Sequence, residues 1–149
     1  MLIEEDGSVH MADGLVFCRT TKAKPFLRGD ESPSFRGILD VTGSGVLDSA
    51  GPILDEAGRK FRVTLSFEDG SLKEVVLDPI LDNAPEGSKK RELQRKSESE
   101  RILAALFGTP NRVSEFRIEY VLYKALIYTY VNWNPRYYDG GGICISYCN

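Results

Sequence analysis

An alternating segment that ends in an Asp-Gly pair, at the centre of the chain, constrains the fold most. Every second residue from Phe61 to Phe67 is apolar, and the residues between them are polar. This period of two is typical of a strand with one buried face. Asp69-Gly70 follows, and these residue types tolerate the positive φ angles of a tight hairpin turn. Residues 72–77 are predicted to return as a second strand, which Pro79 ends because proline has no donor for the ladder.

The register of this return strand stays open in the sequence. Either Val75 and Leu77 or Leu72 and Val76 face inward, depending on the length of the turn. Asp-Gly pairs recur and predict turns at Asp6-Gly7, Asp13-Gly14 and Asp139-Gly140. Further strands are expected at residues 9–11, 15–18, 35–41, 116–120, 125–131 and 143–147, with one short helical turn near 20–27. Glycines and prolines predict loops for the rest of residues 20–59.

One long helix is predicted from Ser88 to Phe107, a segment without proline or glycine and rich in helix-forming residues. Gly108 ends it. Ser97 and Glu100 have the spacing of a capping box, which offers a later start with the N-terminal half projecting from the sheet. The pattern as a whole predicts an α+β fold: a mostly antiparallel twisted sheet of about six to eight strands, built from hairpins, with one main helix packed on a face.

Length and composition predict an ordinary globular chain with one domain over residues 1–149. A domain of 149 residues buries roughly 70% of its unfolded surface. The net charge of −3 disfavours a nucleic-acid partner, whose binding site is usually basic. No run reaches the ~20 apolar residues that cross a bilayer, so no membrane association is expected. The acidic N-terminus, residues 1–6, lacks the features of a secretion signal, which predicts a cytoplasmic protein.

Catalytic and metal-binding candidates are few. His10 is the only histidine, and Cys18 could serve as its nucleophile, but no local motif supports the pair. Thr42–Gly45 lacks the lysine and the spacing of a phosphate-binding loop. A single histidine and three scattered cysteines make a zinc site unfavourable. We therefore predict no catalytic residue, no cofactor and no metal. An enzyme would need a deep pocket that gathers His10, Cys18 or several carboxylates.

The cysteines are predicted to stay reduced. If residues 143–148 form a strand, Cys144 and Cys148 share a face but lie roughly 13 Å apart at ~3.3 Å per residue. A disulfide needs Cα atoms within about 7 Å. Free thiols are usual in a reducing compartment, which agrees with the cytoplasmic expectation.

Two stretches are candidates for binding. Residues 89–101 hold six basic and three acidic residues. This excess indicates either a docking site for phosphate or an acidic partner, or a solvated helix face with pairs such as Glu92–Lys96. All seven tyrosines and the single tryptophan lie between Tyr120 and Tyr147. Tyrosine, tryptophan and arginine are enriched at binding hot spots. The predicted partner-binding residues are Trp133, Arg136, Tyr137 and Tyr138; the alternative is that they cap the sheet structurally.

Three segments carry a resemblance to known proteins: a turn and strand at residues 13–17, a helix end followed by Gly-x-Pro at 106–110, and a closing hairpin at 138–147. Together they resemble small bacterial immunity proteins, which neutralise a toxin encoded by a neighbouring gene. The resemblance implies a non-enzymatic protein-binding module whose partner is a toxin domain. The helix–Gly-Thr-Pro–strand step is also similar to β-lactamase-inhibitor-like proteins and envelope-assembly lipoproteins, which gives an envelope-associated binding module as the alternative.

The chain departs from the immunity group at one position. Members often carry a tryptophan-glycine turn before the last hairpin, and Tyr123-Lys124 stands there in this sequence. Such proteins vary most where they meet their toxins. No site residue is therefore carried over from the resemblance, and the four aromatic and arginine positions rest on residue type and place alone.

Overall fold

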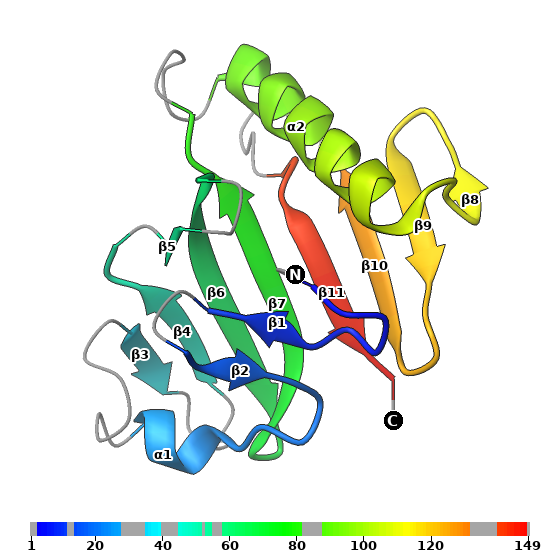
Figure 1. Cartoon of the computed structure of the whole chain (residues 1–149). Helices are drawn as coiled ribbons and strands as arrows, with labels where there is room; N and C mark the ends of the chain where they lie inside the picture. The colour runs from blue at the N-terminus through cyan, green and yellow to red at the C-terminus, as the bar shows by residue number, and fades with distance from the viewer. Residues whose placement is uncertain are drawn as a thin grey trace.

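The structure is a computed structural model that describes residues 3–11, 14–27, 35–39, 45–51, 53–54, 58–81, 88–131 and 140–148. The fold is α+β, as predicted, with an antiparallel sheet and one main helix on one of its faces (Figure 1). The four predicted partner-binding residues, Trp133, Arg136, Tyr137 and Tyr138, lie outside the described residues. No helix in the described ranges is long and apolar enough to span a bilayer.

Within the described residues, a nine-stranded sheet follows the order β3-β4-β6-β7-β11-β10-β9-β8, with β5 pairing β6 off this path. A separate two-stranded sheet contains β1 and β2. The strands are β1 (Val9–His10), β2 (Val16–Phe17), β3 (Phe35–Leu39), β4 (Gly45–Ser49), β5 (Ile53–Leu54), β6 (Lys60–Glu68), β7 (Ser71–Pro79), β8 (Arg112–Val113), β9 (Arg117–Val121), β10 (Ala125–Tyr130) and β11 (Ile143–Tyr147). The helices are α1 (Ala23–Leu27) and α2 (Lys89–Phe107).

The central hairpin, β6–β7, has the predicted turn and an irregularity that the sequence did not reveal. Asp69 and Gly70 both adopt positive φ, at 50° and 75°. A register shift lies between Ser66 and Phe67. The extra residue on β7 lets side chains on either side of the shift face the same way, as a β-bulge does. The alternative in which Val75 and Leu77 face inward is therefore confirmed, and the bulge buries Leu72 on the same face.

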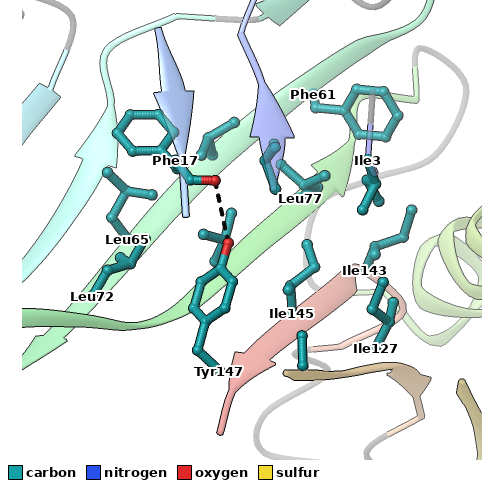
Figure 2. Close-up of a cluster of buried hydrophobic side chains, with 14 of the residues drawn as sticks. Ile3, Phe17, Phe61, Leu65, Leu72, Leu77, Ile127, Ile143, Ile145 and Tyr147 are labelled. Atoms are coloured by element: carbon teal, nitrogen blue, oxygen red, sulfur yellow. Dashed lines mark hydrogen bonds between the residues drawn. The ribbon is translucent and has the colours of Figure 1, made fainter. Parts of the chain in front are cut away.

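One face of the sheet holds the core. In Figure 1, α2 and the β1–β2 pair lie on the same side of the sheet. Figure 2 shows the buried side chains beneath them, with Tyr147 of β11 pointing toward β2. The Tyr147 hydroxyl donates to the carbonyl oxygens of Gly7, at 2.9 Å, and Phe17, at 3.4 Å. These bonds tie the N-terminal strands to the C-terminal one. The opposite face is not covered by any helix or strand of the described residues.

The main helix begins and ends close to the predicted residues. The Ser88 side chain accepts a hydrogen bond from the Arg91 backbone N–H at 3.1 Å, and Gly108 ends the helix with a φ of 73°. The alternative start at Ser97 is wrong, because α2 is continuous from Lys89. Its N-terminal half does not project either, since Glu92 and Ser99 are both buried.

The glycine run after Asp139 explains how this polar half of α2 packs. Gly141 has a φ of 78°, and a Cβ there would lie 2.5 Å from the carbonyl oxygen of Glu92. The chain at Gly141 therefore rests directly on the helix backbone, and Gly140 lies against the Glu92 side chain. Arg95 donates to the Gly140 carbonyl at 3.1 Å, and the Ser99 hydroxyl donates to the Gly141 carbonyl at 2.6 Å. Hydrogen bonds and close backbone contact hold the first half of α2, whereas apolar packing holds the second.

Strands β4 and β5 contradict the prediction of loops for residues 42–59. β4 pairs with both β3 and β6, and β5 pairs with the start of β6. Leu47 of β4 is buried in the core. Glycines at the ends of this short segment favour a loop. Pairing of β4 with a strand on each of its sides outweighs this weak local propensity.

Candidate functional site

The candidate site lies on the uncovered side of the sheet, where side chains alternate with those of the core. We call this surface the open face and define it by the residues that form one connected network. The network crosses from β8 at one edge of the sheet to β7 in its interior. Its members are Arg112 of β8, Arg117 and Glu119 of β9, Tyr128 of β10 and Glu74 of β7.

Tyr128 connects two strands that are not neighbours. It lies opposite Cys144 of β11, and β11 in turn pairs with β7. The Tyr128 hydroxyl donates to Oε2 of Glu74 at 3.0 Å and so passes over β11. Burial raises the pKa of Tyr128 well above its usual range, and the negative charge of Glu74 acts in the same direction. The phenol therefore remains a hydrogen-bond donor at physiological pH.

Arg117 links this pair to the edge of the sheet. Its guanidinium carbon lies 3.8 Å from the centre of the Tyr128 ring, a cation–π contact. Its Nε lies 2.6 Å from Oε1 of Glu119, and Oε2 of Glu119 lies 3.5 Å from Arg112. Tyr130 extends the aromatic part, with its ring centre 6.1 Å from that of Tyr128. The result is a fixed array of charge and ring faces on a sheet surface.

The thiol of Cys144, which lies beneath this array, has little chemical reactivity. Cys144 is only 4% exposed. Burial raises the pKa of Cys144 to about 12, and the nearby carboxylates of Glu74 and Asp78 act in the same direction. The thiolate is the nucleophilic form of cysteine, so a thiol with this pKa has little reactivity near neutral pH.

The two residues considered as a catalytic pair engage different partners. His10 Nε2 lies 2.9 Å from Oε1 of Glu4. The Cys18 sulfur lies 3.2 Å from the Thr20 hydroxyl and accepts a hydrogen bond from Thr21 at 3.9 Å. Burial opposes ionisation of Cys18, but the hydrogen bonds from Thr20 and Thr21 together outweigh it and lower its pKa. Across the described ranges, no group of three or more His, Cys, Asp or Glu side chains could hold a metal ion.

The segment with the four predicted binding residues is held at both ends, although residues 132–139 themselves lie outside the described part of the chain. The Val131 backbone N–H donates to the Phe116 carbonyl, and the Gly141 N–H donates to the Tyr130 carbonyl, each at 2.8 Å. Both ends therefore meet the sheet at the end of β10. Tyr130, the last residue of that strand, is next to the open-face network.

The basic run on α2 is largely engaged within the molecule. An i,i+4 ion pair joins Lys96 and Glu100 within the helix. Arg95 lies 3.8 Å from Asp78 of β7. Further pairs join Arg59 and Arg101 to Glu98, at 2.9 and 3.1 Å. The run therefore positions the helix on the sheet in addition to facing solvent.

The sequence predicts a strand at residues 125–131, which contains Tyr128 and Tyr130, but it does not reveal the partners of these tyrosines. Arg117 and Glu119 were visible only as the polar positions of an alternating strand. These residues join Glu74 in one network only because β11 lies between β7 and β10. No local pattern in the sequence indicates this order of strands.

The chain matches no known family model, no curated protein and no solved structure. The resemblance to immunity proteins therefore remains a prediction. Inference of function rests on the open face and on the elements that build it.

Proposed function

We propose that this protein is a non-enzymatic binding module that docks a protein partner on the open face. The observation that supports this proposal most is the connected network of Arg117, Tyr128 and Glu74 on the side of the sheet opposite the core. These side chains fill no interior space, yet their rings and charges are held in one arrangement. Tyrosine and arginine in such fixed positions are typical anchors of protein interfaces.

Rigidity favours binding here for a physical reason. The network residues stand on paired strands in fixed register, with Tyr128 opposite Cys144 and Glu119. A side chain that is already fixed by cation–π and hydrogen-bond contacts loses less conformational entropy when a partner covers it. The open face is thus prepared for docking before the partner arrives.

The partner that fits best is a toxin domain with a basic surface, which makes the protein an immunity protein. The chain carries a net charge of −3, so it attracts a basic partner through electrostatic steering. Glu74 supplies negative charge on β7 beside Tyr128, whereas Asp78 of the same strand is paired with Arg95 of α2. Trp133, Arg136, Tyr137 and Tyr138 extend this binding surface in the proposal, because their segment leaves the sheet next to Tyr130.

The test uses the product of the gene adjacent to the one that encodes this chain. Isothermal titration calorimetry would measure its affinity for the wild-type protein and for Arg117→Ala and Tyr128→Ala variants. We expect each open-face variant to weaken binding by about tenfold or more, as hot-spot truncations do. Arg101→Ala is the matched control, because Arg101 is 68% exposed and lies on α2, on the other side of the sheet.

Two outcomes would contradict parts of this proposal. If both open-face variants remain folded by circular dichroism and bind as tightly as Arg101→Ala, the open face is not the docking surface. If the adjacent gene product does not bind the wild-type protein at all, the toxin assignment fails for that gene product.

A further inference from the structure

The sheet has a junction where one strand stops and another segment takes its place. β11 ends at Tyr147, whereas β7 continues to Ser71. Beyond the end of β11, residues 21–23 lie along β7: the Leu72 N–H donates to the Thr21 carbonyl at 2.9 Å, and the Ala23 N–H donates to the Gly70 carbonyl at 3.0 Å. An isolated β-bridge joins Lys22 to Ser71. The junction brings the C-terminal strand, the N-terminal region and the central hairpin turn together.

A cavity of about 380 Å³ lies at this junction. Its volume is within the usual range of small-molecule sites, ~300–1,000 Å³. Leu72 and Tyr147, both buried in the core, contribute apolar surface to it. Hydroxyl groups come from Thr20 and Ser71. The cavity shares no residue with the open-face network, so it is separate from the proposed docking surface.

The charged residues that line this cavity have a small excess of positive charge. Its cations are Arg19, Lys22 and Lys73, and its carboxylates are Glu68 and Asp69. Lys73 Nζ lies 3.8 Å from Glu68, so part of this charge is already neutralised. Lys22 Nζ donates to the Ser71 hydroxyl at 2.9 Å. Neither Arg19 nor Lys22 forms an ion pair within the described part of the chain, which leaves two cations available to an anion.

We propose that this cavity binds a small phosphorylated molecule. The Arg19 guanidinium suits a phosphate because its planar fork can donate two parallel hydrogen bonds, and Lys22 adds a second positive charge. Thr20 and Ser71 are neutral donors beside them. The apolar surface of Leu72 and Tyr147 receives the carbon skeleton of the ligand.

The two carboxylates narrow the ligand class. Glu68 is the last residue of β6 and Asp69 the first residue of the hairpin turn, and both can only accept hydrogen bonds when ionised. They favour hydroxyl or amine groups on the organic part of the ligand and disfavour a second anionic group. The ligand is thus a phosphomonoester that carries a hydroxyl or an amine, not a polyphosphate or a nucleic-acid backbone.

The experiment is a titration of the ¹⁵N-labelled full chain with phosphoethanolamine, followed by heteronuclear NMR. Ethanolamine is the control ligand, because it lacks only the phosphate. We expect saturable shifts at the amides of Thr20, Ser71 and Cys148 with phosphoethanolamine and at least about tenfold weaker binding of ethanolamine. Added salt should weaken the phosphoethanolamine effect, since the cations are exposed.

Variants assign the effect to the cavity. Arg19→Ala and Lys22→Ala should each weaken phosphoethanolamine binding by about tenfold. Lys60→Ala, at the far end of β6, is the matched control and should bind as the wild type does. Thermal unfolding monitors folding, and both cavity cations are exposed enough to be replaced without loss of the core. Shifts that do not saturate, equal effects of ethanolamine and phosphoethanolamine, or unchanged binding by both cavity variants would each overturn the proposal.

Discussion

Tyr128 donates a hydrogen bond to Glu74 at 3.0 Å, although a complete strand, β11, separates their strands. The contact is feasible because the side chain opposite Tyr128 on that intervening strand is small, Cys144. A long side chain can pass over it. Because of this hydrogen bond, side chains from β7 and β10 belong to one connected surface on the open face.

Removal of the Tyr128 hydroxyl should destabilise the fold modestly. We expect Tyr128→Phe to lower the free energy of unfolding by about 1 kcal/mol, because one hydrogen bond to a charged acceptor is lost while the ring remains in place. Urea denaturation measures the change. Tyr123→Phe is the control, since Tyr123 is 85% exposed, and it should leave stability unchanged. Equal stability of the two variants would contradict a contribution from the Tyr128–Glu74 bond.

Gly141 should tolerate substitution much less than another glycine of the same backbone conformation. Gly141 and Gly58 share a φ of 78°, but only Gly141 has the helix backbone within 2.5 Å of an added Cβ. We expect Gly58→Ala to cost about 1 kcal/mol from backbone strain alone. Gly141→Ala should cost about 1–3 kcal/mol more, because α2 must move away. Thermal and urea unfolding would compare the two, and similar losses would mean that α2 does not rest on Gly141.

Alkaline pH should unfold the protein through its buried thiol. The folded state raises the pKa of Cys144 from 9.0 to about 12 because the thiol is buried. Below pH 9 the thiol is protonated in both the folded and the unfolded state, so its full contribution to stability is present. Between pH 9 and about 12 it ionises only in the unfolded state, so the free energy of unfolding falls as the pH rises. The loss is about 1.4 kcal/mol per pH unit for this group. Urea denaturation at a series of pH values between 8.5 and about 10 should show this slope in the wild type and a shallower one in Cys144→Ala.

The same slope in both proteins would show that Cys144 does not titrate in this way. Buried Tyr147 has its pKa raised by burial as well, so it adds a further loss of stability at pH values above those that ionise an ordinary tyrosine. Measurements of the thiol should therefore stay at the lower end of the alkaline range.

Alkylation should distinguish Cys18 from Cys144. Hydrogen bonds from Thr20 and Thr21 lower the pKa of Cys18 below 9.0 despite its partial burial, so the thiolate forms at lower pH. We expect iodoacetamide to modify Cys18 of the native protein with a midpoint below pH 9 and to leave Cys144 intact. Mass spectrometry of the digested protein measures both. Double replacement of Thr20 and Thr21 by valine should raise the Cys18 midpoint, and an unchanged midpoint would contradict the role of the hydroxyls.

Local signals explain which parts of the fold were predictable from the sequence. The hairpin at Asp69-Gly70 and the ends of α2 at Ser88 and Gly108 depend on residues only a few positions apart. β4 was missed because its sequence, Gly45–Ser49, becomes a strand only through pairing with β3 and β6. The bulge in β7 was hidden for the same reason, since its position depends on what both strands bury.

The candidate site was predictable only in part, because it depends on the order of strands. The aromatic residues of β10 were identified as a cluster, but the partners Arg117 and Glu74 come from strands on either side of β10 and β11. The glycine run was read as a turn, whereas Gly140 and Gly141 also provide close contact with α2. Contacts between segments far apart in the chain leave no periodic signal in either segment.

Site-specific photocross-linking tests the central claim, docking on the open face, most directly. A p-benzoylphenylalanine residue would replace Tyr130 in one variant and Arg101 in the other, and each would be irradiated with the product of the adjacent gene. The account predicts a covalent complex from the Tyr130 position and none from the Arg101 position. A cross-link from Arg101 with none from Tyr130 would place the partner on the helix side of the sheet and contradict the account.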